Sequence, residues 1–85
     1  MENTIRIYDN GGKTFDRYTV VFMTLPERRP GTFSALGMSA NPFHPQGYGM
    51  HCSAMPGRHL GRRIALAQLP DPCQRLVRRD LAELH

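Results

Sequence analysis

The chain has 85 residues, 40% of them hydrophobic and 21% charged, which is the composition of a globular domain and excludes an intrinsically disordered chain. At this length we expect one domain, spanning residues 1–85, with a small core. Eleven Lys and Arg outnumber seven Asp and Glu, so the net charge is +4, and ten of the eleven cations are arginine.

The lack of a recognisable targeting signal and the low cysteine content predict a cytoplasmic protein. No apolar run approaches the ~20 residues that cross a bilayer, and Met1–Thr4 is neither basic nor apolar, unlike the start of a signal peptide. Two cysteines, Cys52 and Cys73, are too few for a disulfide scaffold. We therefore expect the cytoplasm of the host cell, with both cysteines as half-buried free thiols.

The N-terminal part predicts a β-hairpin. Residues 4–8 alternate and are rich in β-formers, and residues 18–23 form the most strand-like run of the chain, typical of a central strand. Asn10-Gly11 lies between them and is a strong hairpin signal, so we expect the turn within residues 9–14.

The middle of the chain predicts further short strands. Residues 25–31 carry proline near both ends and predict a loop, and residues 32–39 predict a third strand with a bulge at Gly37. Residues 52–55 are compatible with a short strand or a loop, and residues 62–66 with a short edge strand.

The C-terminal part predicts a helix over residues 72–84. Asp71, Pro72 and Gln74 have the order of an N-cap, a first-turn proline and the third residue of a capping box. One apolar face follows at helical spacing, made of Cys73, Leu76, Val77, Leu81 and Leu84. Strands first and a helix last predict an α+β fold, a small antiparallel β-sheet of three to five strands covered by one C-terminal α-helix.

The segment 41–52 is the strongest candidate for a working surface. Its two prolines and two glycines break helix and strand, and loops this long without secondary structure are usually functional or disordered. We predict a recognition loop here, in which the contacts are Phe43, His44, Gln46, Tyr48 and His51.

Arginine clusters provide a second candidate surface. They are Arg28, Arg29, Arg58, Arg62, Arg63, Arg75, Arg78 and Arg79. Arginine suits phosphates, carboxylates and bases, and aromatic residues in the loop can stack on bases. Signatures of the common RNA- and DNA-binding motifs are absent from the sequence, so these clusters are compatible with either nucleic acid or protein as the partner.

Metal and catalytic alternatives rest on the histidines and cysteines. His44, His51, Cys52, His59 and Cys73 supply metal-ligating atoms, but their spacing matches no zinc motif, and we expect neither a metal nor a cofactor. A Cys–His pair needs its members on one face, whereas neighbours such as His51 and Cys52 point to opposite faces of a strand. We expect no catalytic residue, and a small His-dependent hydrolase or metal enzyme is the third hypothesis.

Three stretches together carry a resemblance: residues 5–20 (IRIYDNGGKTFDRYTV), 38–49 (MSANPFHPQGYG) and 59–64 (HLGRRI). They resemble a family of small proteins encoded by phages, prophages and plasmids. The resemblance implies a protein that acts on host machinery, as anti-CRISPR proteins do, by binding a Cas surveillance complex. A chain at +4 cannot mimic DNA with an acidic surface overall, so the contact would be an acidic or apolar patch, or nucleic acid in the complex.

The first functional hypothesis is therefore a non-catalytic binding protein of a mobile genetic element that inhibits host defence by occluding a host nucleoprotein complex. The alternative is a basic accessory protein that binds nucleic acid directly.

Overall fold

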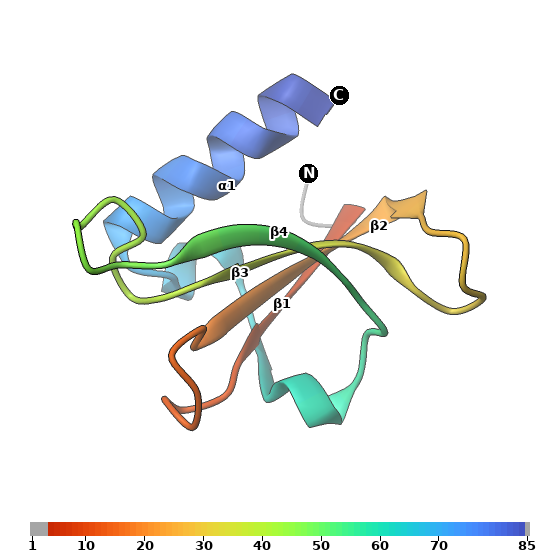
Figure 1. Cartoon of the computed structure of the whole chain (residues 1–85), viewed down its shortest axis with the longest axis horizontal. Coiled ribbons are helices and arrows are strands. Elements are labelled where there is room, and N and C mark those ends of the chain that lie inside the picture. Colours follow the sequence, from red (N-terminus) through yellow and green to blue (C-terminus); the bar gives the residue numbers. More distant parts are fainter. Residues whose placement is uncertain (1–3, 85) are drawn as a thin grey trace.

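A computed structural model describes residues 4–84 and consists of a five-stranded antiparallel sheet with a C-terminal helix across one face (Figure 1). The elements are β1 (Ile5–Asp9), β2 (Tyr18–Pro26), β3 (Phe33–Met38), β4 (Gly49–Ala54), the 3₁₀ turn η2 (Arg58–Leu60), β5 (Arg62–Ile64), the 3₁₀ turn η3 (Leu66–Gln68) and α1 (Asp71–Leu84). This confirms the predicted α+β class, with the sheet at the upper end of the expected strand number.

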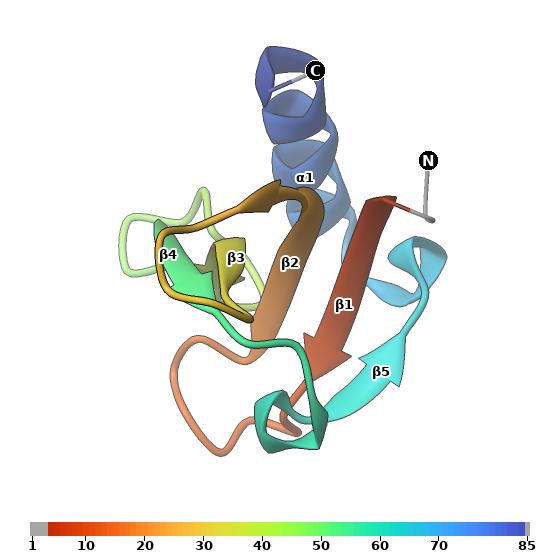
Figure 2. The same ribbon diagram turned by 90° about the vertical axis from the view of Figure 1, so that its right-hand side faces the viewer.

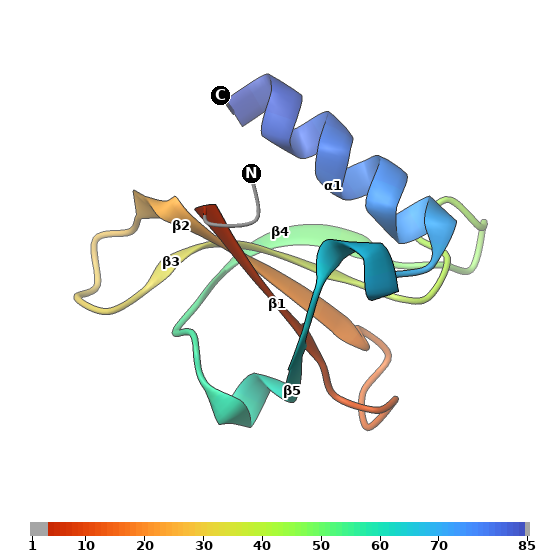
Figure 3. The ribbon, with the colours of Figure 1, turned by 180° about the vertical axis from the view of Figure 1, so that it is seen from behind.

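The strand order is β4-β3-β2-β1-β5, so β2 is central, as its β-branched and aromatic composition predicts. β4 and β5 are consecutive strands in the sequence but lie at opposite edges of the sheet (Figure 2). The connection between them, which carries η2, crosses the face opposite α1 (Figure 3). It returns to the sheet at Gly61, where φ is +121° and a Cβ would lie 2.3 Å from the Asp9 carbonyl oxygen.

The main core lies between the sheet and α1. Alternate residues of a strand point to the same face of the sheet. The apolar residues on the face toward α1 pack against the apolar face of that helix. The main core comprises Ile5, Ile7, Tyr18, Val20, Phe22, Leu36, Met38, Ile64, Leu66, Leu69, Cys73, Leu76, Val77 and Leu81. The predicted helix face is thus confirmed for four of its five members, and the side chain of Leu84 lies outside the described residues.

The other sheet face carries a smaller cluster. Tyr8, Val21 and Ala35 are buried there, and Leu60 of η2 packs against them together with Met23, Phe33 and Ala54. The crossing connection therefore covers part of this face and leaves the rest to solvent. Among the described residues, no helix is both long and apolar enough to span a membrane.

The loop of the N-terminal hairpin is longer than predicted. Asp9 pairs with Tyr18, and the Asn10 N–H donates to the Arg17 carbonyl at 3.0 Å, so the loop extends beyond residues 9–14. Asn10 does not adopt positive φ; its side-chain oxygen instead accepts the Gly12 and Lys13 amides. An ion pair between Arg17 Nε and Asp9 Oδ1, 2.8 Å apart, closes the loop, and the hydrogen bond from Arg17 lowers the pKa of Asp9.

Two strand boundaries and one bulge differ from prediction. β2 continues to Pro26, so the loop predicted over residues 25–31 begins later than expected. β4 begins at Gly49, so the loop predicted over residues 41–52 ends earlier than expected. Gly37 pairs regularly with Thr19 and with Met50, and the irregularity lies in β2 between Val21 and Pro26. A Cβ at Gly37 would lie 3.4 Å from the Asp16 carboxylate and 3.7 Å from the Tyr48 ring, which is ordinary van der Waals contact, so lack of space does not explain this glycine.

The start of α1 also corrects the prediction. The Gln74 N–H donates to the Pro70 carbonyl, so the helix begins at Asp71 and the predicted N-cap is its first residue. The Gln74 side chain donates to the Leu69 carbonyl at 2.8 Å and closes no capping box with Asp71. Asp71 still carries its negative charge in the first turn, where the helix dipole favours it.

Candidate binding surface

The β3–β4 loop is an ordered structure built from consecutive turns. The Asn41 carbonyl accepts the His44 N–H, and the His44 carbonyl accepts the Gly47 N–H at 2.7 Å. At the base of the loop, the Ser39 N–H donates to the Tyr48 carbonyl, and the Tyr48 N–H donates to Ser39 Oγ, both at 2.9 Å. The loop therefore presents its side chains from a fixed backbone.

Cys73 ties this loop to the helix. Its buried thiol donates to the carbonyl oxygens of Ser39 and Ala40, at 3.2 and 3.4 Å. Burial raises the pKa of Cys73 to about 11, since a thiolate would lose its hydration there. The expectation of two half-buried thiols is therefore wrong in its degree of burial, since Cys73 is fully buried and Cys52, on the edge strand β4, is exposed.

Alkaline pH should destabilise the protein through Cys73. Its folded pKa, about 11, lies above that of an unfolded thiol, so the stabilisation is complete below the unfolded pKa and is lost as pH rises to about 11. Denaturation at pH 8–11 should show the free energy of unfolding falling by up to about 1.4 kcal/mol per pH unit. Cys73→Ala should flatten that slope, and identical slopes in both proteins would refute the assignment.

Phe43 and two arginines form the most distinctive surface feature, which we call the Phe43 cluster (Phe43, Arg75 and Arg79). Phe43 is 49% exposed as a residue. The guanidinium carbons of Arg75 and Arg79 lie 5.5 and 5.8 Å from its centre, within the range of cation–π attraction. One turn of α1 separates the two arginines, so the helix and the loop together define the cluster.

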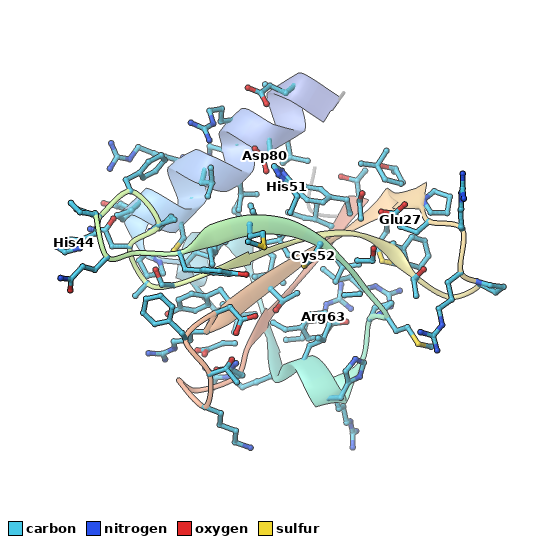
Figure 4. All side chains as sticks on the ribbon, viewed as in Figure 1. Glu27, His44, His51, Cys52, Arg63 and Asp80 are labelled. Atoms are coloured by element: carbon cyan, nitrogen blue, oxygen red, sulfur yellow. The ribbon has the colours of Figure 1, made fainter. Side chains whose placement is uncertain are left out.

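His44 and Gln46 lie beside the loop of the N-terminal hairpin rather than in the Phe43 cluster. With residues 12–15 of the hairpin loop and residues 39–41, they line an open hollow of about 550 Å³. His44 Nδ1 accepts the Gln46 N–H at 3.1 Å, which places the proton of the neutral ring on Nε2. Figure 4 shows His44 at the tip of the loop, far from His51.

Tyr48 lies on the sheet face opposite α1. Its ring meets Phe15 edge-on, with centres 6.1 Å apart, and its hydroxyl donates to the Met50 sulfur at 3.3 Å. Phe15 is 64% exposed and Met50 55% exposed, so these side chains form an apolar patch on that face.

His51 points to the other face, toward the helix. Its Nε2 lies 2.7 Å from Asp80 Oδ2, and Figure 4 shows the pair between β4 and α1. The Asp80 side chain is 2% exposed and that of His51 is 66% exposed. The imidazole therefore bridges a buried carboxylate and solvent. His51 and Cys52 point to opposite faces, so they cannot share a proton.

All eight predicted arginines are exposed, and they gather in three places. Arg28 and Arg29 line a hollow of about 690 Å³ with His59, and Arg58, Arg62 and Arg63 line another of about 500 Å³ beside Tyr8. The third group is on α1, where Arg75 and Arg79 join the Phe43 cluster and Arg78 donates to the Gln74 side chain. The first two groups lie at and beside η2, which begins at Arg58 and contributes residues to both hollows.

Asp80 is the residue that the sequence prediction missed. It follows Leu76 by four residues and Cys73 by seven, so helical spacing alone puts it on the apolar face. A carboxylate in that stripe was the available signal that the helix has a polar partner on the sheet. Within residues 4–84, no three potential metal-ligating side chains cluster.

Comparisons with models of protein families, with curated proteins and with solved structures found no match to this chain.

Proposed function

We propose that the chain is a non-catalytic binding protein, and that its primary contact is the Phe43 cluster. The observation that supports this is an aromatic residue that is 49% exposed and whose ring is flanked by two arginines. Aromatic and arginine residues dominate the binding energy of protein interfaces. The ordered loop holds the Phe43 ring and the helix holds the two arginines in place before binding, so little conformational entropy is lost when a partner binds.

The partner that we propose is a host nucleoprotein complex, with a Cas surveillance complex as one example, and the effect of binding is occlusion. The resemblance to proteins of mobile genetic elements suggests this class. The chemistry of the Phe43 cluster is compatible with it, because guanidinium groups bind carboxylates as well as phosphates. An acidic protein patch close to bound nucleic acid would engage both the ring and the arginines.

Direct binding to nucleic acid is the second candidate. It is favoured by the two arginine groups at and beside η2, since their five guanidinium groups border two hollows that η2 helps to line. A basic surface of this kind attracts a phosphate backbone and makes affinity depend on salt.

Affinity capture from a host lysate tests the first candidate. Phe43→Ala should weaken capture of the partner by about 1–3 kcal/mol, and capture by the wild type should survive nuclease treatment. Phe15→Ala is the matched control, because that ring is also exposed but lies on the opposite face. Capture that disappears with nuclease supports the second candidate, and equal recovery by both variants refutes the role of Phe43.

A further inference from the structure

β4 ends the sheet on one side, and its outer edge has no strand beside it in residues 4–84. It pairs with β3 over six consecutive residues, from Gly49 to Ala54, without a break in register. The other edge strand, β5, is three residues long. β4 therefore offers the longer free edge.

The hydrogen-bond pattern identifies which backbone groups face outward. The Ser39 N–H donates to the Tyr48 carbonyl, so residues 39 and 48 form a hydrogen-bonded pair. Such pairs alternate along an antiparallel ladder, and the register then directs the backbone of Met50, Cys52 and Ala54 toward β3. The N–H and C=O groups of Gly49, His51 and Ser53 face away from the sheet.

Nothing in the strand protects this edge. Natural proteins block open edges with charged side chains, prolines or bulges. The sequence of β4, Gly-Met-His-Cys-Ser-Ala, holds no Lys, Arg, Asp, Glu or Pro, and its pairing with β3 is regular. An unprotected edge of this length is a template for one further strand.

The surroundings of the edge select the chemistry of that strand. On the helix side lie His51 and the two arginines of the Phe43 cluster, and on the other side lie the exposed Met50 and Cys52. Side chains of an added strand would alternate between these two environments. Acidic groups suit the arginine side, and apolar groups suit the methionine side.

We propose that the β4 edge binds an extended segment of a partner protein as a sixth, edge strand, and that this segment alternates acidic and apolar side chains. The proposal rests on the proposed binding function and specifies how the partner is held. A second copy of the chain is disfavoured, because two-fold pairing through β4 would bring the arginines of both helices to one seam. Backbone hydrogen bonds supply affinity, and the alternating side chains supply specificity.

The test uses a peptide of about eight residues that alternates valine and glutamate, with a valine–lysine peptide as its counterpart. Fluorescence anisotropy at about 0.15 M salt should show the glutamate peptide binding at least about tenfold tighter than the lysine peptide. Hydrogen exchange should show new protection at the amides of Gly49, His51 and Ser53. Equal affinity of the two peptides, or protection elsewhere, overturns the proposal.

Two substitutions locate the contact. Ser53→Pro removes an outward N–H while leaving the bonds to β3, and should weaken peptide binding at least about tenfold relative to Ser53→Ala, which keeps that N–H. Arg79→Glu should weaken the glutamate peptide and strengthen the lysine peptide, whereas Arg63→Glu, at the opposite edge, should change the ratio little. This inversion keeps the proposal testable if the proline variant does not fold.

Two further outcomes would overturn the proposal. Sedimentation showing a dimer that Ser53→Pro converts to a monomer would assign the edge to a second copy. Lysate capture that survives Ser53→Pro but is lost in Phe43→Ala would refute strand addition and leave the proposed function standing.

Discussion

Replacement of His51 by alanine is expected to lower the free energy of unfolding by about 1–3 kcal/mol, the cost of leaving a buried hydrogen-bond acceptor without its donor. His51 Nε2 lies 2.7 Å from a carboxylate that is 2% exposed. Without the imidazole, the Asp80 carboxyl group stays in the interface between helix and sheet, where a polar group without a hydrogen-bond partner is costly. Since the His51 side chain itself is 66% exposed, little of the loss comes from its own packing.

Substitution of Asp80, the other member of the pair, should change stability much less than substitution of His51. Asp80→Leu removes the buried charge and leaves His51 at the surface, where water can satisfy it, so the change in stability should be small. The double variant His51→Ala, Asp80→Leu should recover most of what His51→Ala alone loses. Urea denaturation of the three variants measures this cycle. Equal losses in both single variants would show that the pair itself, rather than the buried carboxylate, determines stability.

The sequence predicted the elements whose signal is local. β2 combines β-branched and aromatic residues, and the helix repeats Cys73, Leu76, Val77 and Leu81 at 3.6-residue spacing, so short-range preference and burial agree. The predicted hairpin turn, within residues 9–14, is shorter than the observed loop, because the Asn10-Gly11 signal reports only on its immediate neighbours. The Asp9–Arg17 ion pair, which closes a longer loop, joins residues eight positions apart.

The candidate surface was predicted less completely, since it depends on strand order. Phe43 and His51 belong to one stretch of sequence, yet the ring meets arginines of α1 while the imidazole meets Asp80. Tyr48 faces the other side of the sheet, because strand residues alternate. Residue type made the segment a candidate for function, but only the placement of β4 at an edge beside α1 determines which side chains lie together.

Replacement of Gly47 by alanine is expected to disrupt the β3–β4 loop. A Cβ at this position would lie 2.0 Å from the Asn41 carbonyl oxygen and 3.0 Å from that of His44. Both are backbone atoms that close the turns of the loop, so neither can move without breaking those turns. The strain should cost about 1–3 kcal/mol of stability and should release Phe43 from its arginines.

Gln46→Ala is the matched control, because it shortens an exposed neighbour and keeps the backbone bond to His44 Nδ1. Nuclear magnetic resonance of the Phe43 ring and of the Arg75 and Arg79 guanidiniums should report loss of the cluster in Gly47→Ala and its retention in Gln46→Ala. Partner capture should fall in parallel with Phe43→Ala if the fixed loop is what presents the ring. If Gly47→Ala keeps the cluster and its stability, the loop has a second backbone arrangement, and the argument that it is preorganised for binding fails.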